Sequence, residues 1–209
     1  MFCDLDGTLV LNNSFHVFIT ELWKGCRGRR RLELVTILAA RLPGSALGGH
    51  SGMKRRLLEW VGRQPQDWQA TITERTVEAL RPTMSQPVMA RLADYKKKEA
   101  VIVLATAAPL IYAGDIAAIA GADEVLATTA QWGVFAELIR EAKADACAAW
   151  MVRRDGSHAF RHVVAITDHP DDLPLLRMAD HVVLQCERTR KQGILDALHF
   201  DGKTYDFID

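Results

Sequence analysis

Two aspartates one residue apart, Asp4 and Asp6, are the residues whose spacing most clearly suits chemistry. They follow a short apolar segment and precede Gly7 and Thr8, so they stand where a strand would end in a tight turn. One carboxylate can attack phosphorus, while the other can protonate the leaving group and later deprotonate water. Gly7 permits the backbone conformation that would bring this turn close to a phosphate. The pattern indicates phosphoryl transfer through an aspartate; the alternative is an acidic turn that merely ends a strand.

Further polar residues follow later apolar segments. Thr106 follows one such run and precedes a predicted helix, where its hydroxyl and the neighbouring amides could bind phosphate oxygens. Asp168 and Asp172 follow another run, and Lys143 lies in a helical stretch between the two. Because ligands of open parallel sheets bind at the carboxyl ends of the strands, we expect these residues to meet the first two aspartates there. Oxygen ligands that leave room for water and phosphate suit Mg²⁺, so the set predicts a magnesium-dependent phosphate site.

The elements that must position these residues form an α/β pattern interrupted by a helical insertion. Strands alternate with helices after residue 86, which predicts a doubly wound parallel sheet. Residues 13 to about 94 show helical periodicity without a convincing strand. We therefore expect a core of residues 1–12 and 86–209 and an all-helical inserted domain of residues 13–85. The predicted helices span 14–24, 30–40, 53–62, 65–79, 87–98, 110–120, 135–151 and 172–178, and the later strands span 100–105, 124–128, 163–166 and 181–185.

The composition is that of an ordinary globular protein. Of 209 residues, 49% are hydrophobic and 25% charged, and the formal net charge is zero, so no overall field favours nucleic acid or a membrane. The four cysteines are widely spaced without a CxxC pair, which favours reduced thiols over a disulfide framework or zinc site. No secretory signal is visible, and no apolar run approaches the roughly 20 residues that span a bilayer. We expect a cytoplasmic protein.

The whole sequence resembles the haloacid dehalogenase superfamily of hydrolases, in its phosphoserine-phosphatase-like branch with a helical C1 cap. The resemblance rests on Asp4-Leu5-Asp6-Gly7-Thr8-Leu9, the strand end at Thr106, Lys143, and residues 168–172, which are similar to the family's GDSxxD motif. It implies that Asp4 is the nucleophile and Asp6 the general acid and base. Dehalogenases of the superfamily do not need the second aspartate, because halide leaves without a proton. Asp6 therefore favours phosphate ester hydrolysis.

The resemblance also implies binding roles. Thr106 and Lys143 would hold the phosphoryl oxygens. The implied magnesium ligands are Asp4, Asp6 (through its backbone carbonyl), Asp168 and Asp172. Asp172 would ligate the ion or orient its surroundings, and whether it or Asp171 does so is decided only by the family spacing.

Other interpretations of single residues stay open. A threonine that ends a buried strand often only satisfies backbone groups, and a lysine on an amphipathic helix usually faces solvent. Arg140, Arg153 and Arg154 could take the role of the lysine. His169 and Thr167 stand where the family has serine and glycine, and the histidine either lies near the phosphate or metal or has no role. Only three residues precede the first aspartate, so we expect the native strand to begin upstream and a longer form to be more stable.

The stretch from residue 24 to residue 56 is strongly basic. It contains a single acid, Glu33, against Lys24, Arg27, Arg29, Arg30, Arg31, Arg41, Lys54, Arg55 and Arg56. Such a surface could attract anionic substrates or rest on anionic lipid. The alternative is a solvated helical surface balanced by acids elsewhere. No aromatic interleaving supports nucleic-acid binding.

Together these patterns predict a Mg²⁺-dependent phosphatase that hydrolyses a small phosphorylated metabolite through an aspartyl-phosphate intermediate. A phosphotransferase or mutase could use the same residues. A binding protein that keeps the fold without catalysis is the other alternative.

Overall fold

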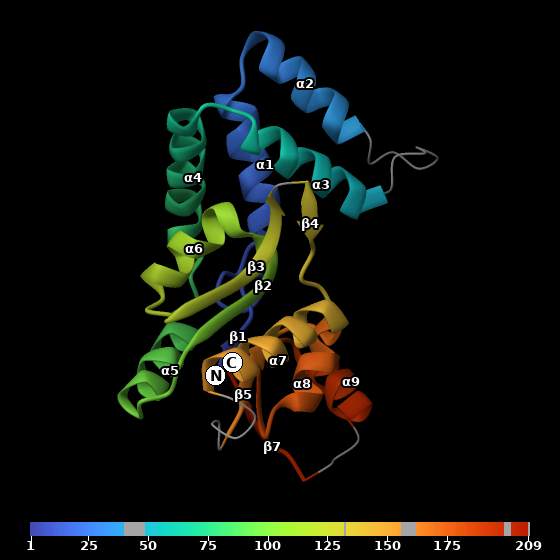
Figure 1. Cartoon of the computed structure of the whole chain (residues 1–209). Helices are drawn as coiled ribbons and strands as arrows, with labels where there is room; N and C mark the ends of the chain where they lie inside the picture. The colour runs from blue at the N-terminus through green and yellow to red at the C-terminus, as the bar shows by residue number, and fades with distance from the viewer. Residues whose placement is uncertain (40–48, 132, 156–161, 199–201, 209) are drawn as a thin grey trace.

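The computed structural model describes residues 1–39, 49–131, 133–155, 162–198 and 202–208. Within these residues, its centre is a seven-stranded sheet in the order β4-β3-β2-β1-β5-β6-β7 (Figure 1). The strands are β1 (Phe2–Cys3), β2 (Val103–Pro109), β3 (Glu124–Gln131), β4 (Val134–Ala136), β5 (Val164–Thr167), β6 (His181–Leu184) and β7 (Thr204–Phe207). Only β4 runs antiparallel to its neighbour. The predicted α/β class with a doubly wound parallel sheet is confirmed.

The two faces of the sheet are built by alternate residues of each strand, as the period of two in a strand requires. Phe2 and Val103 belong to a cluster with α7 (Glu141–Asp155), α8 (Leu173–Met178) and α9 (Arg188–Leu198). Cys3 and Leu104, their successors, belong to a second cluster that includes residues of α5 (Gln86–Lys97) and α6 (Leu110–Ile119). Helices therefore cover both faces, which leaves the strand ends as the places where polar side chains can gather.

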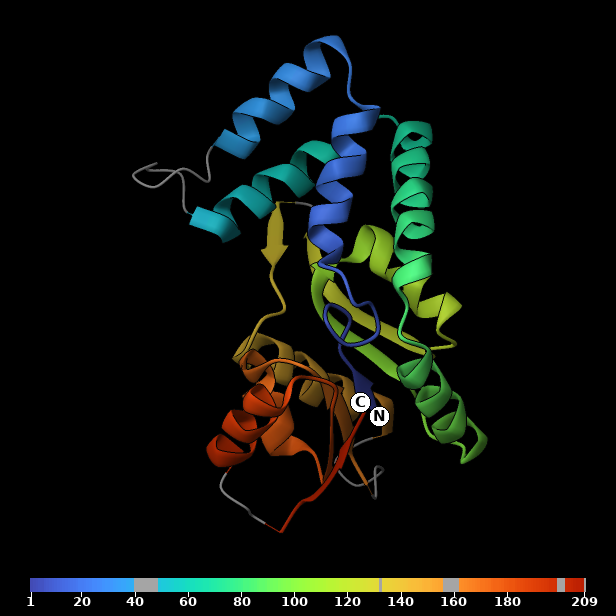
Figure 2. The same cartoon turned by 180° about the vertical axis from the view of Figure 1, so that it is seen from behind.

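Among the described residues, four helices lie between β1 and α5, and we call this part of the chain (residues 14–80) the helical segment. They are α1 (Ser14–Gly25), α2 (Gly28–Ala39), α3 (Gly49–Gly62) and α4 (Gln66–Leu80), with a 3₁₀ turn at Arg81–Thr83. Asn13 caps α1, since its side-chain oxygen accepts a hydrogen bond from His16 N at 2.9 Å. Figures 1 and 2 show the segment gathered at one end of the molecule, beside β3 and β4. All four predicted helices occur there, although Ala40 lies outside the described residues.

One predicted helix was wrong in its first part. Residues 134–136 form β4 instead of opening a helix over 135–151, and α7 begins only at Glu141. Gly133, with φ of +79°, turns the chain back so that β4 pairs with residues 129–131 of β3. The apolar residues of 134–139 had the spacing of a helix, but the turn and the strand pairing overrode it. The helix α9 and the strand β7 were not predicted at all.

The order of the strands locates the crevice. From β1 the chain passes first to β2 and β3 on one side, and it later returns to β5, β6 and β7 on the other. In open α/β sheets, ligands bind at such a switch point, outside the carboxyl ends of the strands. The ends of β1, β2 and β5 are therefore where a site is expected.

Two predictions made from the composition concern membrane-spanning helices and the cysteines. None of the described helices is long and apolar enough to cross a membrane. The four cysteines are free thiols, of which Cys3, Cys26 and Cys147 are buried.

Candidate active site

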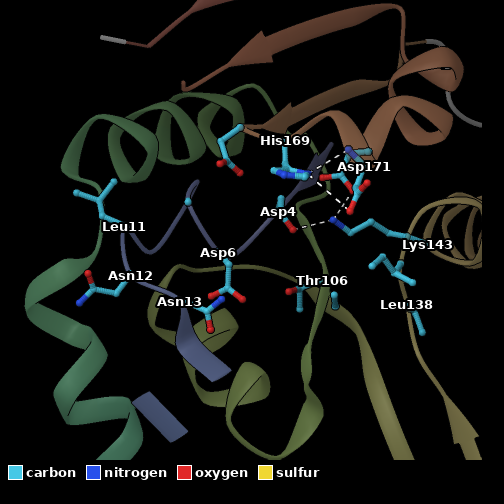
Figure 3. Close-up of a pocket in the computed structure, with 15 residues that line it drawn as sticks. Asp4, Asp6, Leu11, Asn12, Asn13, Thr106, Leu138, Lys143, His169 and Asp171 are labelled. Atoms are coloured by element: carbon cyan, nitrogen blue, oxygen red, sulfur yellow. Dashed lines mark hydrogen bonds and ion pairs between the residues drawn. The ribbon is translucent and has the colours of Figure 1, made fainter. Parts of the chain in front are cut away.

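The carboxyl ends of β1, β2 and β5 border a cavity of about 420 Å³ (Figure 3). All six residues that the sequence singled out line it: Asp4, Asp6, Thr106, Lys143, Asp168 and Asp172. The remaining wall comes from the segment after β1 (Gly7 and residues 11–13), from Ala107 of β2, from Leu138 and Ile139 between β4 and α7, and from His169 and Asp171 after β5. The topology thus brings together residues that are as much as 168 positions apart in the sequence.

Lys143 ties the centre of the site together. Its Nζ lies 2.7 Å from Asp4 Oδ1 and 2.7 Å from Asp172 Oδ1. All three residues are buried. The other carboxylate oxygen of Asp172 accepts a hydrogen bond from Thr167 Oγ1 at 2.6 Å. A chain of polar contacts therefore runs from Thr167 at the end of β5 through Asp172 and Lys143 to Asp4. Figure 3 shows the Lys143 side chain reaching toward Asp4.

The charges in this chain are unequal, because two carboxylates share one ammonium. Burial raises the pKa of Asp4 to about 7, against the favourable charge of Lys143. Burial alone would lower the pKa of Lys143, but the two carboxylates outweigh it and raise that pKa. The lysine therefore stays an ammonium, while the site retains an excess of negative charge that a bound cation would offset.

Asp6 contacts the first residue of the helical segment. Its Oδ1 accepts a hydrogen bond at 2.7 Å from the backbone N–H of Ser14, the first residue of α1. The Ser14 hydroxyl is within 3.0 Å of the Tyr112 hydroxyl, so the serine is held on its other side as well. Burial raises the pKa of Asp6, although the Ser14 bonds oppose that shift. A carboxyl group with a raised pKa is suited to donate a proton to a leaving group.

Gly7 allows the loop after β1 to lie directly against Asp168. Its φ is +78°, and a Cβ at this position would lie only 2.3 Å from Asp168 Oδ2. No other residue type fits that approach, because real Cβ atoms do not come this close to an oxygen. Asp168 also accepts hydrogen bonds from Thr8 Oγ1 at 3.2 Å and Arg190 Nη1 at 3.0 Å.

Thr106 lies within β2, where the register with β3 shifts, and not after a strand of residues 100–105 as predicted; its side chain lines the cavity (Figure 3). Its Oγ1 accepts a hydrogen bond at 3.0 Å from the backbone N–H of Ala108. A hydroxyl has one hydrogen to donate and two lone pairs. The bond from Ala108 uses a lone pair, so the hydrogen can still be donated to a phosphoryl oxygen.

The competing residues lie at the rim or outside the cavity. Arg140 Nε lies 3.1 Å from Asp171 Oδ1, in an exposed ion pair, and is not among the residues that line the cavity. Arg154 lies 3.8 Å from Glu124, also away from the cavity. His169 does line it, and its Nδ1 accepts a hydrogen bond from the backbone N–H of Asp171. A catalytic role for this histidine stays untested.

The basic stretch does not form the cavity wall, since none of its described residues lines the cavity. Several of its cations are paired with acids, as the alternative interpretation predicted. The pairs are Lys24–Glu21, Arg29–Glu33, Lys54–Glu137 and Arg55–Glu59. Arg41 lies outside the described residues.

The carboxylates of the cavity are oxygen donors of the kind that Mg²⁺ prefers. Among the described residues, no group of three or more histidine, cysteine, aspartate or glutamate side chains is arranged to hold a metal. Mg²⁺ needs less than that, since it is usually bound through one or two carboxylates together with waters and substrate phosphate. Asp4 and Asp168 line the same cavity and supply two such carboxylates, so the residues fit this ion. Asp172 contacts Lys143 through one oxygen and Thr167 through the other, so this carboxylate holds the lysine in place.

The site includes residues that sequence reasoning missed. Arg190 of α9 contacts Asp168, yet the helix that carries it was not predicted. Thr8 belongs to the motif and Ser14 follows it, but nothing in their spacing indicated a hydrogen bond to a site carboxylate. Thr167 was noticed only as a departure from the family pattern, and that departure was the available signal.

The comparison with family models gives a clear result. The model described as haloacid dehalogenase-like hydrolase matches residues 1–177. No curated protein matches the chain.

Solved structures extend the likeness to the remaining residues. A protein of unknown function from Bordetella pertussis Tohama I has a TM-score of 0.79 at 17% identity, over 100% of this chain and 96% of that one. A phosphoserine phosphatase with a phospho-aspartyl intermediate analogue has a TM-score of 0.59 at 14% identity, over 91% and 88%. A phosphoserine phosphohydrolase-like protein from Francisella tularensis subsp. tularensis SCHU S4 has a TM-score of 0.58 at 17% identity, over 92% and 91%. These likenesses show a shared fold.

Proposed function

The chain belongs to the haloacid dehalogenase-like hydrolase family, and from this premise and the site geometry we propose that it is a Mg²⁺-dependent phosphatase acting through an aspartyl-phosphate. The observation that carries the proposal is the Lys143 ammonium, 2.7 Å from Asp4 Oδ1, in a cavity that Asp6 also lines. A nucleophile, an acid and a phosphate-binding cation then surround one space. The fold that the chain shares with phosphoserine phosphatases is consistent with this chemistry.

The reaction would proceed in two displacements. The Asp4 carboxylate attacks phosphorus, and the alkoxide leaves with the proton of Asp6. Water then attacks the aspartyl-phosphate, with Asp6 taking its proton, which releases phosphate and restores Asp4. Lys143 and Thr106 hold the phosphoryl oxygens through both steps. Bound Mg²⁺, held by Asp4, Asp168 and the backbone carbonyl of Asp6, would offset charge on the phosphoryl group.

The substrate would be a small phosphorylated metabolite. The cavity volume of about 420 Å³ lies in the range of small-molecule sites. Structural neighbours include a substrate-bound phosphoserine phosphatase, so phosphoserine belongs in the first panel of candidates. We propose a cytoplasmic location from the reduced cysteines, and a cap role for residues 13–85 from the position of the helical segment beside the cavity.

The test is hydrolysis of p-nitrophenyl phosphate with Mg²⁺ and after its removal by a chelator. We expect metal-dependent turnover that Asp4→Asn abolishes and Asp6→Asn lowers strongly. Asp94→Asn is the matched control, because Asp94 is exposed on α5 and forms a surface ion pair with Lys97. Turnover that persists in Asp4→Asn would refute the aspartyl-phosphate route.

The alternatives give other outcomes. A phosphotransferase or mutase would yield a phosphorylated acceptor in place of free phosphate. A binding protein without catalysis would show no metal-dependent turnover on any phosphorylated metabolite in the panel.

A further inference from the structure

Lys54 is a buried cation that the proposed mechanism does not use. It lies on α3, with 5% of its surface exposed, and is not among the residues that line the cavity. Its Nζ lies 2.6 Å from Glu137 Oε1 and donates a hydrogen bond at 3.1 Å to the carbonyl of Ala107. The other Glu137 oxygen accepts from Ser51 Oγ at 2.5 Å. An ammonium is costly to bury unless it is paired, so these partners fix the position of the lysine.

Lys54 contacts the carbonyl of Ala107, and Ala107 directly follows Thr106, the candidate phosphate-binding residue. This Ala107 oxygen accepts a second hydrogen bond, at 2.7 Å, from Thr128 Oγ1 of β3. Thr128 Oγ1 in turn accepts from the backbone N–H of Leu138 at 3.2 Å. The carbonyl is thereby held from α3, from β3 and, indirectly, from the loop that precedes α7.

Fixing this carbonyl also fixes the group on the other side of the peptide. The peptide unit is planar, so the orientation of the Ala107 carbonyl sets the direction of the Ala108 N–H. That N–H donates to Thr106 Oγ1 at 3.0 Å. The bond occupies a lone pair of the hydroxyl and leaves its hydrogen for a partner in the cavity.

We infer that Lys54, braced by Glu137, is a positioning residue that orients the Thr106 hydroxyl toward a phosphoryl oxygen through the Ala107–Ala108 peptide. The inference rests on the proposed function, since it gives the hydroxyl a phosphate to bind. It gives the helical segment a part in phosphate binding through Lys54, a residue that does not touch the substrate. A charged donor suits this role because its hydrogen bonds are stronger than those of neutral groups.

The experiment compares Lys54→Met with Arg55→Met. The control changes the next residue of the same helix, whose pair with Glu59 is more exposed. Two quantities are measured on each folded variant: the affinity for inorganic phosphate by calorimetry with Mg²⁺, and kcat and KM for p-nitrophenyl phosphate. We expect Lys54→Met to weaken phosphate binding and kcat/KM about tenfold, as the loss of one oriented hydrogen bond allows, while Arg55→Met stays within about twofold.

A double-mutant cycle with Thr106→Val separates positioning from a general structural effect. If Lys54 acts through Thr106, then Lys54→Met will have little further effect on phosphate affinity in the Thr106→Val background. Additive losses, or a Lys54→Met variant that binds phosphate like the wild type, would overturn the inference. Should Lys54→Met fail to fold, Thr128→Val removes the other donor to the same carbonyl, and its cycle with Thr106→Val decides by the same criterion. A chain that binds phosphate without hydrolysing p-nitrophenyl phosphate would refute the proposed function, and the binding cycle would still decide the role of Lys54.

Discussion

The hydroxyl of Thr167 is a single group whose removal tests how the residues of the site are held in place. Thr167 is fully buried, donates to Asp172 Oδ2 at 2.6 Å and accepts from the N–H of His169 at 3.2 Å. Thr167→Val keeps the shape and removes the hydroxyl. A hydrogen bond to a charged group contributes about 1.5–3 kcal/mol, so we expect unfolding to become easier by that amount. For a chain of this length, this corresponds to a fall of roughly 3–12 °C in Tm.

The same substitution is expected to lower activity, because Asp172 holds Lys143 and Lys143 contacts Asp4. If the freed carboxylate moves the lysine by even a fraction of an ångström, kcat/KM should fall about tenfold or more. Thermal unfolding and p-nitrophenyl phosphate hydrolysis measure the two effects, with Thr167→Ser as the variant that keeps the hydroxyl and loses only a methyl group. The reasoning fails if valine leaves stability and kcat/KM unchanged, or if serine is as damaging as valine to activity.

Three further changes have defined outcomes. Gly7→Ala places a Cβ against Asp168 at a positive φ, so we expect loss of Mg²⁺-dependent turnover and about 1–2 kcal/mol of backbone strain, checked by activity and urea unfolding. Lys143→Met leaves two buried carboxylates without their counter-ion, which should cost about 3–5 kcal/mol in urea unfolding; equal stability would contradict the buried pairing. Burial would raise the pKa of Glu137, but its hydrogen bonds and the charge of Lys54 lower that pKa below the usual 4.5. The ionised Glu137 therefore adds to the free energy of unfolding above pH 4.5, and this contribution is lost as the pH falls through the lowered pKa. Glu137→Gln should therefore be less stable than the wild type at neutral pH and approach it in acid, as urea titrations across this range would measure.

The sequence predicted the site more completely than its surroundings. All six candidate residues line one cavity. A parallel sheet places the carboxyl ends of its strands at a single edge, and each candidate follows such an end or lies close to one. Motif spacing also distinguished Lys143 from Arg140, which lies only three residues away but pairs with Asp171. Both inferences needed only local patterns and a topology that those patterns indicated.

The contacts that the sequence could not predict join residues that are far apart in the chain. Lys54 and Ala107 are 53 positions apart, and Lys54 and Glu137 are 83 apart. No periodicity within a helix or strand says which residues of two such elements will meet. The prediction for the hairpin of β3 and β4 failed for a related reason. The turn at Gly133 and the pairing of the two strands outweighed an apolar spacing that is typical of a helix.

The helical segment holds two groups of the cavity, the Asp6 carboxylate and the peptide that follows Thr106. At its first residue, the Ser14 N–H holds the Asp6 carboxylate at 2.7 Å, at the amino end of α1, where the helix dipole favours negative charge. At α3, Lys54 holds the peptide that follows Thr106. The proposed acid and base, Asp6, and the proposed phosphate-binding hydroxyl of Thr106 are thus both anchored to the described helices of this segment, although neither residue belongs to them. If both residues act as proposed, a change in how this segment sits on the sheet will alter proton transfer and phosphate binding together.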